Sequence, residues 1–276
     1  MNICEMTALE ISNAVKNKEI SVKDAVDAFF AAIDEYDGKY HCYNTLCKKE
    51  AYERAEEVQE GIDSGKYNGR LAGVPIGIKD NICTKDILTT CSSKILENFI
   101  PTYNATVVNR LNDEGMVIIG KLNMDEFAMG STTETSATGV THNPWDTDKV
   151  PGGSSGGAAA AVAARLSPVA LGSDTGGSIR QPCSFCGVSG LKPTYGAVSR
   201  YGLVAYASSL DQIGPMGKTV DDCAALFSVI QGKDEKDGTS MVYPKFDFDK
   251  AVKGDVGGKK IGIPEDYLGE GISPDV

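Results

Sequence analysis

Residues 151–182 read PGGSSGGAAAAVAARLSPVALGSDTGGSIRQP, and this stretch decides the fold. Two glycine–serine clusters, GGSSGG and TGGS, flank an alanine-rich segment and a short apolar segment. Residues 157–166 are predicted to form a helix because alanine has the highest helix propensity, and Val169–Leu171 to form a short buried strand. A helix and a returning strand would bring a serine of GGSSGG beside Ser178. The stretch therefore predicts a nucleophilic serine with backbone N–H groups free to hold an oxyanion.

A nucleophilic serine needs a base, and the chain offers only two histidines. His41 lies in the polar stretch KYHCYN and His142 in the turn-like THNPWD, so neither is expected to be catalytic. A lysine held neutral by burial is the alternative base. Lys79 ends the apolar run GVPIGI and is followed by Asp80. From this segment alone, Lys79 is either the base or a strand-end lysine paired with Asp80.

Four longer stretches carry a family resemblance: GVPIGIKDNI, GKLNMDEFAMG, VPGGSSGGAAAAVAA and LGSDTGGSIRQPCSFCGVSGLKPTYGAVSRYG. With these motifs the chain resembles the amidase signature family from about residue 7 to residue 272. Within that family, NMDEFAMGSTTETS and VSRYGLVAYASSLDQIGPM resemble the A subunits of glutamyl-tRNA(Gln) amidotransferases. The expected fold is therefore the α/β amidase-signature fold, a mixed β-sheet core covered by helices.

The resemblance implies a Ser-Ser-Lys triad that transfers the acyl group of an amide. Ser178 would be the nucleophile, Ser154 would relay its proton, and Lys79 would be the base that receives it. In the family the peptide before the relay serine is cis, which here would be Gly153–Ser154. Glutamine would form a γ-glutamyl ester on Ser178, and hydrolysis of this ester would complete the release of glutamate and ammonia.

The resemblance also implies how the oxyanion is bound. Backbone N–H groups of Thr175, Gly176, Gly177 and Ser178 would supply the donors. Ser155 is a candidate supporting residue that would hydrogen-bond Lys79, although a second serine in a glycine-rich turn is equally consistent with a purely structural role.

A three-subunit enzyme is implied as well, in which the B subunit holds tRNA and activates it with ATP. The A-type chain would hydrolyse glutamine to supply ammonia for misacylated Glu-tRNA(Gln), and in some organisms for Asp-tRNA(Asn). No cofactor or metal is expected in this chain, since ATP and magnesium belong to the partner subunit. The net charge of −11 agrees, because an acidic chain is poorly suited to grip phosphate backbones by itself.

Two other functions are compatible with parts of the sequence. A stand-alone amidase for small amides would have the same triad and no partner subunits. A nucleotide-binding module would use GGSSGG as a phosphate loop at a helix N-terminus. The second alternative lacks the GxxxxGK[ST] pattern, because alanines follow Gly157.

Composition predicts an ordinary soluble protein with 41% hydrophobic and 24% charged residues. Eight scattered cysteines and the lack of a secretory signal or long apolar run favour a reduced cytoplasm. Residues 1–66 are expected to form a helical segment packed on an α/β core of residues 67–276, together one domain. Trp145 is expected to pack against the protein rather than bind a ligand. Cys183 and Cys186 are expected to be buried thiols, since no second pair accompanies their C-x-x-C spacing.

The C-terminal part departs from the family pattern. A new strand is expected at residues 259–264, close to the last residue, Val276. Family members continue beyond this point with side chains that hold the α-carboxylate and α-amino groups of glutamine. We therefore expect the core to be incomplete, and the 276-residue chain to be poorly stable or self-associating, with little specificity for glutamine.

Overall fold

The computed structural model describes residues 2–244, 247–254, 257–265 and 269–273. The chain divides into two compact units, residues 1–246 and residues 247–276. The second unit contains helix α8 (Phe248–Val252). Residues 259–264 have no regular secondary structure, so the strand predicted there is wrong. The sheet and the candidate site belong to the first unit.

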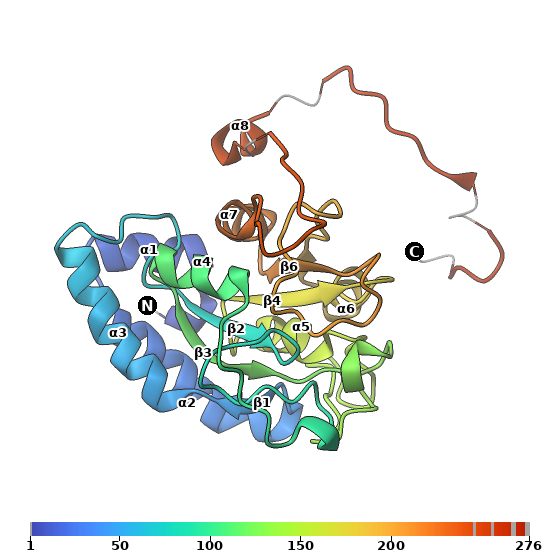
Figure 1. The fold of residues 1–276 in the computed structure, drawn as a ribbon, viewed down its shortest axis with the longest axis horizontal. Helices are drawn as coiled ribbons and strands as arrows, with labels where there is room; N and C mark the ends of the chain where they lie inside the picture. The colour runs from blue at the N-terminus through green and yellow to red at the C-terminus, as the bar shows by residue number, and fades with distance from the viewer. Residues whose placement is uncertain (1, 245–246, 255–256, 266–268, 274–276) are drawn as a thin grey trace. The chain divides into compact units, whose positions relative to one another are not determined.

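A six-stranded mixed sheet forms the centre of the first unit, in the order β1-β3-β2-β4-β6-β5. The strands are β1 (Tyr43–Leu46), β2 (Pro75–Lys79), β3 (Val117–Leu122), β4 (Val169–Asp174), β5 (Ser189–Gly190) and β6 (Gln212–Gly217). Strand β2 is parallel to both β3 and β4, whereas the other pairings are antiparallel. The carboxyl ends of β2 and β4 therefore meet at one edge of the sheet, as Figure 1 allows the reader to follow. Lys79 and Asp174 end these two strands.

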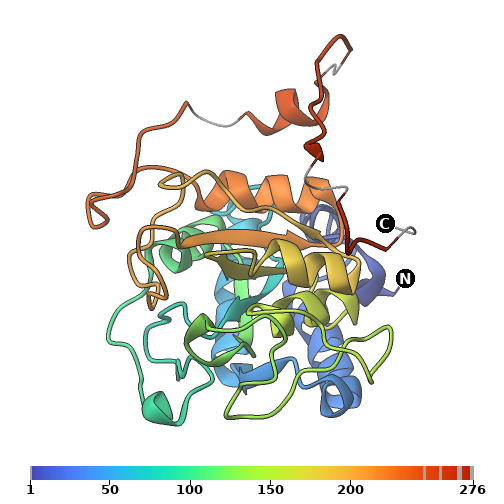
Figure 2. The ribbon, with the colours of Figure 1, turned by 90° about the vertical axis from the view of Figure 1, so that its right-hand side faces the viewer.

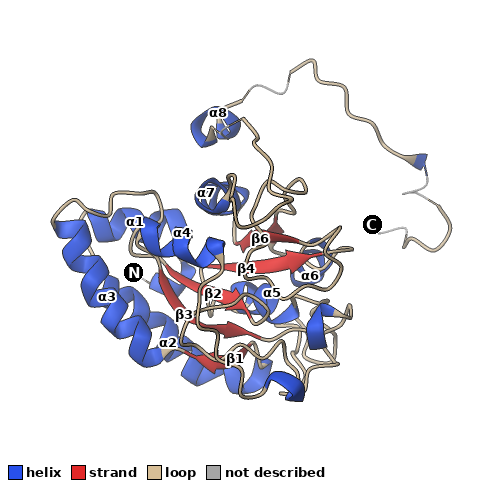
Figure 3. Ribbon diagram, in the orientation of Figure 1, coloured by secondary structure: helices blue, strands red, loops and turns tan. Residues whose placement is uncertain are grey.

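Helices flank the sheet, and Figure 3 shows them on both sides of the strands. They are α1 (Ala8–Lys16), α2 (Val22–Tyr40), α3 (Lys48–Asp63), α4 (Thr106–Glu114), α5 (Gly156–Ala163), α6 (Arg180–Cys186) and α7 (Val220–Ile230). Helix α3 packs on β3, α5 packs on β2 and β4, and α7 lies along β6 (Figure 2). The predicted α/β fold with a mixed sheet covered by helices is confirmed. None of the described helices is long and apolar enough to cross a lipid bilayer.

The N-terminal helices follow the sequence signals closely. Thr7 and Ser21 both form capping boxes with an acidic residue three positions later. The apolar stripe of α2 is buried, as its helical spacing predicts: Val22, Ala25, Val26, Phe29, Phe30 and Ile33. Helices α2 and α3 pack on one another and on the sheet within the first unit. The boundary between residues 66 and 67 stays a prediction.

Helix α5 lies in the core because its residues have almost no side chains. The helix ends at Ala163, three residues before the predicted end. A Cβ on Gly157 would lie 2.5 Å from the Asn123 carbonyl oxygen and 2.7 Å from the Cys42 carbonyl oxygen. A larger residue would force the neighbouring backbone to shift, since neither carbonyl oxygen can rotate away as a side chain could. The helix N-terminus, and with it GGSSGG, is thereby fixed inside the protein.

The prediction for the two cysteines is confirmed, whereas the prediction for Trp145 is not. Cys183 and Cys186 are buried thiols, as predicted, and donate to different carbonyls, of Ser189 at 3.6 Å and Pro151 at 3.3 Å. Trp145 packs less than expected, because 75% of its surface is exposed. Its indole N–H donates to the Cys186 carbonyl at 2.7 Å, so this ring is held by one polar contact rather than by burial.

Candidate active site

Lys79 lies at the carboxyl end of β2 with no exposed surface. Its Nζ lies 2.7 Å from the Oγ of Ser154 and donates to the Ser173 carbonyl at 3.3 Å. Of the two partners that the sequence left open, Ser154 is therefore the one that Lys79 contacts.

Asp80 pairs with a different lysine. Its Oδ1 lies 3.6 Å from the Nζ of Lys121, and both side chains are fully buried. Its Oδ2 accepts hydrogen bonds from the N–H and hydroxyl groups of Thr90 and from the Asn44 amide. The interpretation of Lys79 as the partner of Asp80 is thus wrong. Successive side chains of an extended chain point to opposite sides, so Asp80 leaves Lys79 free for Ser154.

Burial lowers the pKa of Lys79 from 10.5 to about 7, because a charged ammonium is costly in a dry interior. The nearby carboxylates of Asp125 and Asp174 oppose this by raising the same pKa, and burial prevails. A lysine with such a pKa is largely neutral just above pH 7, so its nitrogen has a lone pair available to accept a proton.

The turn that carries Ser154 is built from close contacts. The Gly153–Ser154 peptide is cis, as the family resemblance implies. The Asp125 N–H donates to the Ser154 carbonyl at 3.2 Å, and a Cβ on Gly153 would lie 2.1 Å from the Asp125 carboxylate. Only glycine fits at position 153 without moving Asp125, which is itself buried.

Ser155 does not contact Lys79 directly. Its hydroxyl donates to the Ser173 carbonyl at 3.1 Å and accepts from the Ser173 N–H at 3.3 Å. Lys79 and Ser155 therefore share the Ser173 carbonyl as an acceptor. The predicted hydrogen bond from Ser155 to Lys79 is not formed, and the contacts of the Ser155 hydroxyl with Ser173 agree with the structural alternative.

Ser178 lies between β4 and α6 and is partly exposed. Its carbonyl accepts a 3.2 Å hydrogen bond from the Ser155 N–H, which brings the two glycine–serine clusters together. In residues 2–244 no hydrogen bond joins the hydroxyls of Ser154 and Ser178. The structure thus links Lys79 to Ser154 directly, and links Ser178 to them through the adjoining backbone.

Asp174 holds the loop that carries Ser178. Its carboxylate accepts from the N–H groups of Gly177 at 2.8 Å and Ile179 at 3.1 Å, and pairs with the Arg180 guanidinium at 2.9 Å. Burial alone would raise the pKa of Asp174, but the Arg180 and backbone hydrogen bonds outweigh burial and hold this pKa below 3.8. The carboxylate therefore stays charged and keeps the loop folded around it.

The Asp174 contacts change the set of oxyanion donors. The Gly177 N–H is engaged by Asp174, so it is not a free donor, contrary to the sequence-based expectation. Gly177 has a φ of +124°, which glycine adopts readily. Within residues 2–244 the N–H groups of Thr175, Gly176 and Ser178 make no hydrogen bond. These three remain available to hold an oxyanion.

Sequence reasoning missed several residues of this site, including Ser173, Asp125, Asp174 and Asn81. Asp174 could have been found, since an acidic residue directly before TGGS can accept from the N–H groups of a glycine-rich turn. Asn81 and Ser173 carry no comparable local signal, because their contact joins residues 92 positions apart.

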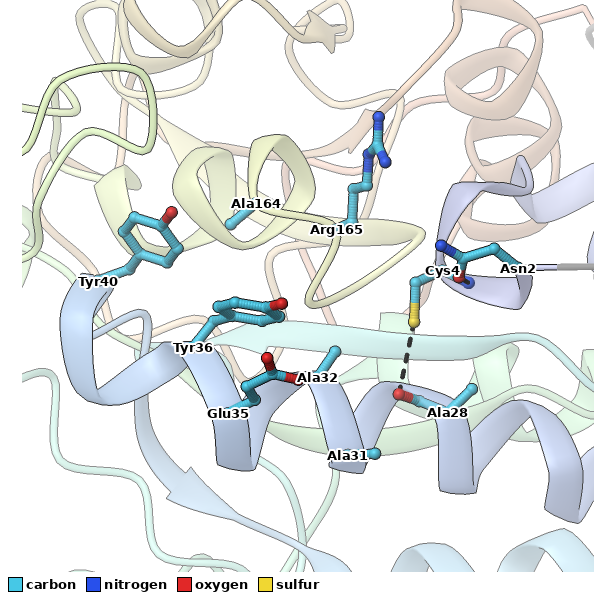
Figure 4. Close-up of a pocket in the computed structure, with 10 residues that line it drawn as sticks. All are labelled: Asn2, Cys4, Ala28, Ala31, Ala32, Glu35, Tyr36, Tyr40, Ala164 and Arg165. Carbon is cyan, nitrogen blue, oxygen red and sulfur yellow. Dashed lines mark hydrogen bonds between the residues drawn. The ribbon is translucent and has the colours of Figure 1, made fainter.

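A separate cavity of about 490 Å³ lies between the N-terminal segment, α2 and the end of α5. Figure 4 shows Tyr36 and Tyr40 of α2 facing it, with Arg165 on the opposite wall. Cys4 also lines it, and its thiol donates to the Ala28 carbonyl at 3.4 Å. This cavity contains none of the residues around Lys79.

The chain is similar in sequence to curated proteins over its whole length. One is the A subunit of glutamyl-tRNA(Gln) amidotransferase from Lachnoclostridium phytofermentans, 58% identical over 277 residues, covering all of this chain and 56% of the relative. Another is the corresponding protein of Agathobacter rectalis, 59% identical over 276 residues and covering 55% of the relative. The chain thus spans about half the length of the curated relatives it matches.

Two solved structures share the fold. The A subunit of the Thermotoga maritima glutamyl-tRNA(Gln) amidotransferase is 45% identical with a TM-score of 0.75, over 88% of this chain and 50% of that one. Native peptide amidase of Stenotrophomonas maltophilia is 34% identical with a TM-score of 0.83, over 88% of this chain and 51% of that one. The fold alone therefore does not separate these two kinds of enzyme. The amidase family model matches residues 24–276, and the chain belongs to the amidase family.

Proposed function

We propose that this chain carries the glutaminase site of the A subunit in a glutamyl-tRNA(Gln) amidotransferase. The observation that carries the proposal is the contact of a fully buried lysine, with a pKa lowered to about 7, with the Ser154 hydroxyl at 2.7 Å. Identities of 58–59% to relatives of that name, against 34% to the peptide amidase, support this assignment.

In the proposed reaction the Ser178 hydroxyl attacks the side-chain carbonyl of glutamine. Its proton passes to Ser154 as the Ser154 proton passes to the neutral Lys79 amine. Free N–H groups of Thr175, Gly176 and Ser178 bind the oxyanion that forms. The C–N bond then breaks, and the proton returned through Ser154 leaves with ammonia. Water, deprotonated along the same route, hydrolyses the γ-glutamyl ester to glutamate and regenerates Ser178.

The partners follow from the same assignment. Ammonia would pass to an enzyme with B and C subunits, in which the B subunit holds tRNA and uses ATP and magnesium. Misacylated Glu-tRNA(Gln) would be the acceptor, with Asp-tRNA(Asn) as an acceptor in some organisms. The net charge of −11 fits a chain that leaves tRNA binding to a partner. We propose the cytoplasm as its location.

The second candidate is a stand-alone amidase for small amides, favoured by the TM-score of 0.83 with peptide amidase. The phosphate-loop alternative gains no support, because residues 151–160 are all buried and the Ser154 and Ser155 hydroxyls are engaged inside the protein.

Ammonia release from glutamine separates the two enzymes. The 276-residue chain is assayed alone and with B and C subunits of a relative, ATP and charged tRNA. The amidotransferase assignment predicts that added partners raise glutamine turnover, and that Ser178→Ala abolishes it whereas exposed Ser209→Ala does not. Hydrolysis of simple amides at a rate unaffected by the partners would favour the stand-alone amidase.

A further inference from the structure

Asn81 is a buried amide close to the proposed base. It lies two residues after Lys79 and has 1% of its surface exposed. Its Nδ2 donates to the Ser173 hydroxyl at 3.0 Å. Among the described residues its buried Oδ1 has no hydrogen-bond partner. A buried oxygen without a hydrogen-bond partner lowers the stability of the fold, and such unpaired polar atoms are rare in folded proteins.

Ser173 connects this amide to the base. Its carbonyl accepts from the Lys79 Nζ at 3.3 Å and from the Ser155 hydroxyl at 3.1 Å. Its N–H donates to the Ser155 Oγ at 3.3 Å, and its hydroxyl accepts from Asn81. Hydrogen bonds on three atoms fix this one residue. The direction of the Ser173 carbonyl is set by the pairing of Ser173 with Ile213 of β6, together with the contacts that Ser173 makes with Asn81 and Ser155.

The direction of this carbonyl matters because of the shape of a neutral amine. A neutral lysine has two N–H donors and one lone pair, and a base must aim the lone pair at the proton it accepts. An N–H held by the Ser173 carbonyl leaves the lone pair free to turn toward the Ser154 hydroxyl. A small misalignment of such a group lowers the rate steeply.

We propose that Asn81 is a positioning residue for Lys79, which acts by fixing Ser173 so that the Ser173 carbonyl orients the Lys79 amine toward Ser154. The proposal deepens the proposed function and rests on it for the identity of the base. It assigns to Asn81 a part in proton transfer without contact with the substrate.

The charges around Lys79 make the proposal testable by a single-atom change. Asp125, Asp174, Asp211 and the Cys91 thiol already act on Lys79 from neighbouring elements, and each favours its charged form. Asp80, in the same segment, is paired with the buried Lys121. Position 81 contributes an uncharged amide, so Asn81→Asp would add one carboxylate of the same shape beside Ser173.

The first measurement follows the lysine ¹³Cε signals of the 276-residue chain against pH, with the Lys79 signal identified by its loss in Lys79→Met. Lys79 is expected to titrate near pH 7 in the wild type. In Asn81→Asp the titration should move upward by about one unit or more, because a carboxylate at this range favours the ammonium. The exposed Asn13→Asp is the matched control and should leave the titration unchanged. This readout requires no activity toward glutamine, so it is independent of the substrate assignment.

The second measurement is the rate at which a fluorophosphonate phosphonylates Ser178, a reaction that forms a bond from the serine oxygen to phosphorus and releases fluoride. Asn81→Ala should be about tenfold slower at every pH, because the amine is less well aimed. Asn81→Asp should be slow at pH 7 and recover near pH 9, since a carboxylate can still hold the Ser173 hydroxyl. Should Asn81→Ala fail to fold, Ser173→Ala removes the same hydrogen bond from the other side and should give the same loss. An unchanged Lys79 titration in Asn81→Asp, or phosphonylation of Ser178 at the wild-type rate in the alanine variant, would overturn the proposal.

Discussion

The Nζ of Lys79 lies 2.7 Å from the Oγ of Ser154, although 75 residues separate them in the chain. The contact forms because the end of β2 lies beside the turn that precedes α5, where Gly153 allows Asp125 to approach closely. It places a buried amine against a buried hydroxyl with no histidine involved.

Replacing Lys79, the proposed base, should remove activity without lowering the stability of the fold. Lys79→Met is expected to slow the reaction of Ser178 with a fluorophosphonate by about 10²–10⁴-fold, the range for a lost general base. The exposed Lys85→Met should have no such effect. Stability should hold, because a buried amine replaced by an apolar side chain is often neutral or stabilising. Thermal melts check the stability, and the rate of fluorophosphonate labelling of Ser178 checks the activity.

The difference in the free energy of unfolding between the wild type and Lys79→Met is predicted to depend on pH. In the unfolded chain Lys79 titrates near its reference pKa of 10.5, and in the folded chain near 7. Between these values the unfolded state binds more protons, so the free energy of unfolding of the wild type rises with pH relative to Lys79→Met. The penalty is fully present below about pH 7 and absent above about pH 10.5. Chemical denaturation of both proteins at several pH values measures this, and a difference in the free energy of unfolding that stays constant with pH would contradict the prediction.

Two helical glycines should respond to alanine in opposite directions. A Cβ on Gly157 would meet backbone atoms of Asn123 and Cys42, so Gly157→Ala should destabilise by about 1–3 kcal/mol through overpacking. Gly38 in α2 has open space within 4 Å of its would-be Cβ. Gly38→Ala should therefore stabilise by about 0.5–1 kcal/mol through helix propensity. Denaturant titrations of both variants measure the two changes in the free energy of unfolding. Equal changes would contradict the claim that the small residues of α5 allow it to pack in the core.

The Asp80–Lys121 pair predicts strong non-additivity. Lys121→Met leaves a buried carboxylate without its cation and should cost about 3–5 kcal/mol of stability. The double variant Lys121→Met with Asp80→Asn removes both charges and should cost much less than the sum of the two single changes. A double-mutant cycle measured by chemical denaturation tests this, and additive costs would exclude the pair as an interacting unit.

Individual residues show which parts of the fold and of the candidate site could be predicted from the sequence. Local signals located the capping boxes at Thr7 and Ser21 and the alanine helix after GGSSGG, because these depend on neighbours within one turn. Family motifs indicated which serines and which lysine to consider. The partners of Asp80 and Asn81 could not be foreseen, since each depends on a contact set by the folded loops. Asp174, the partner of the Gly177 N–H, had a local sequence signal and was missed. The strand expected at residues 259–264 failed because an apolar, β-branched run is only a weak signal without a partner strand.

Phosphonylation of Ser178, followed by mass spectrometry as a function of pH, tests the central claim most directly. The account predicts that a fluorophosphonate labels Ser178, at a rate that rises through about pH 7 as Lys79 loses its proton and then reaches a plateau. In Lys79→Met the rate should be low, and the inflection near pH 7 should be absent. Labelling of a different serine, or a Ser178 rate in the wild type that does not change across pH 7, would contradict the proposed triad.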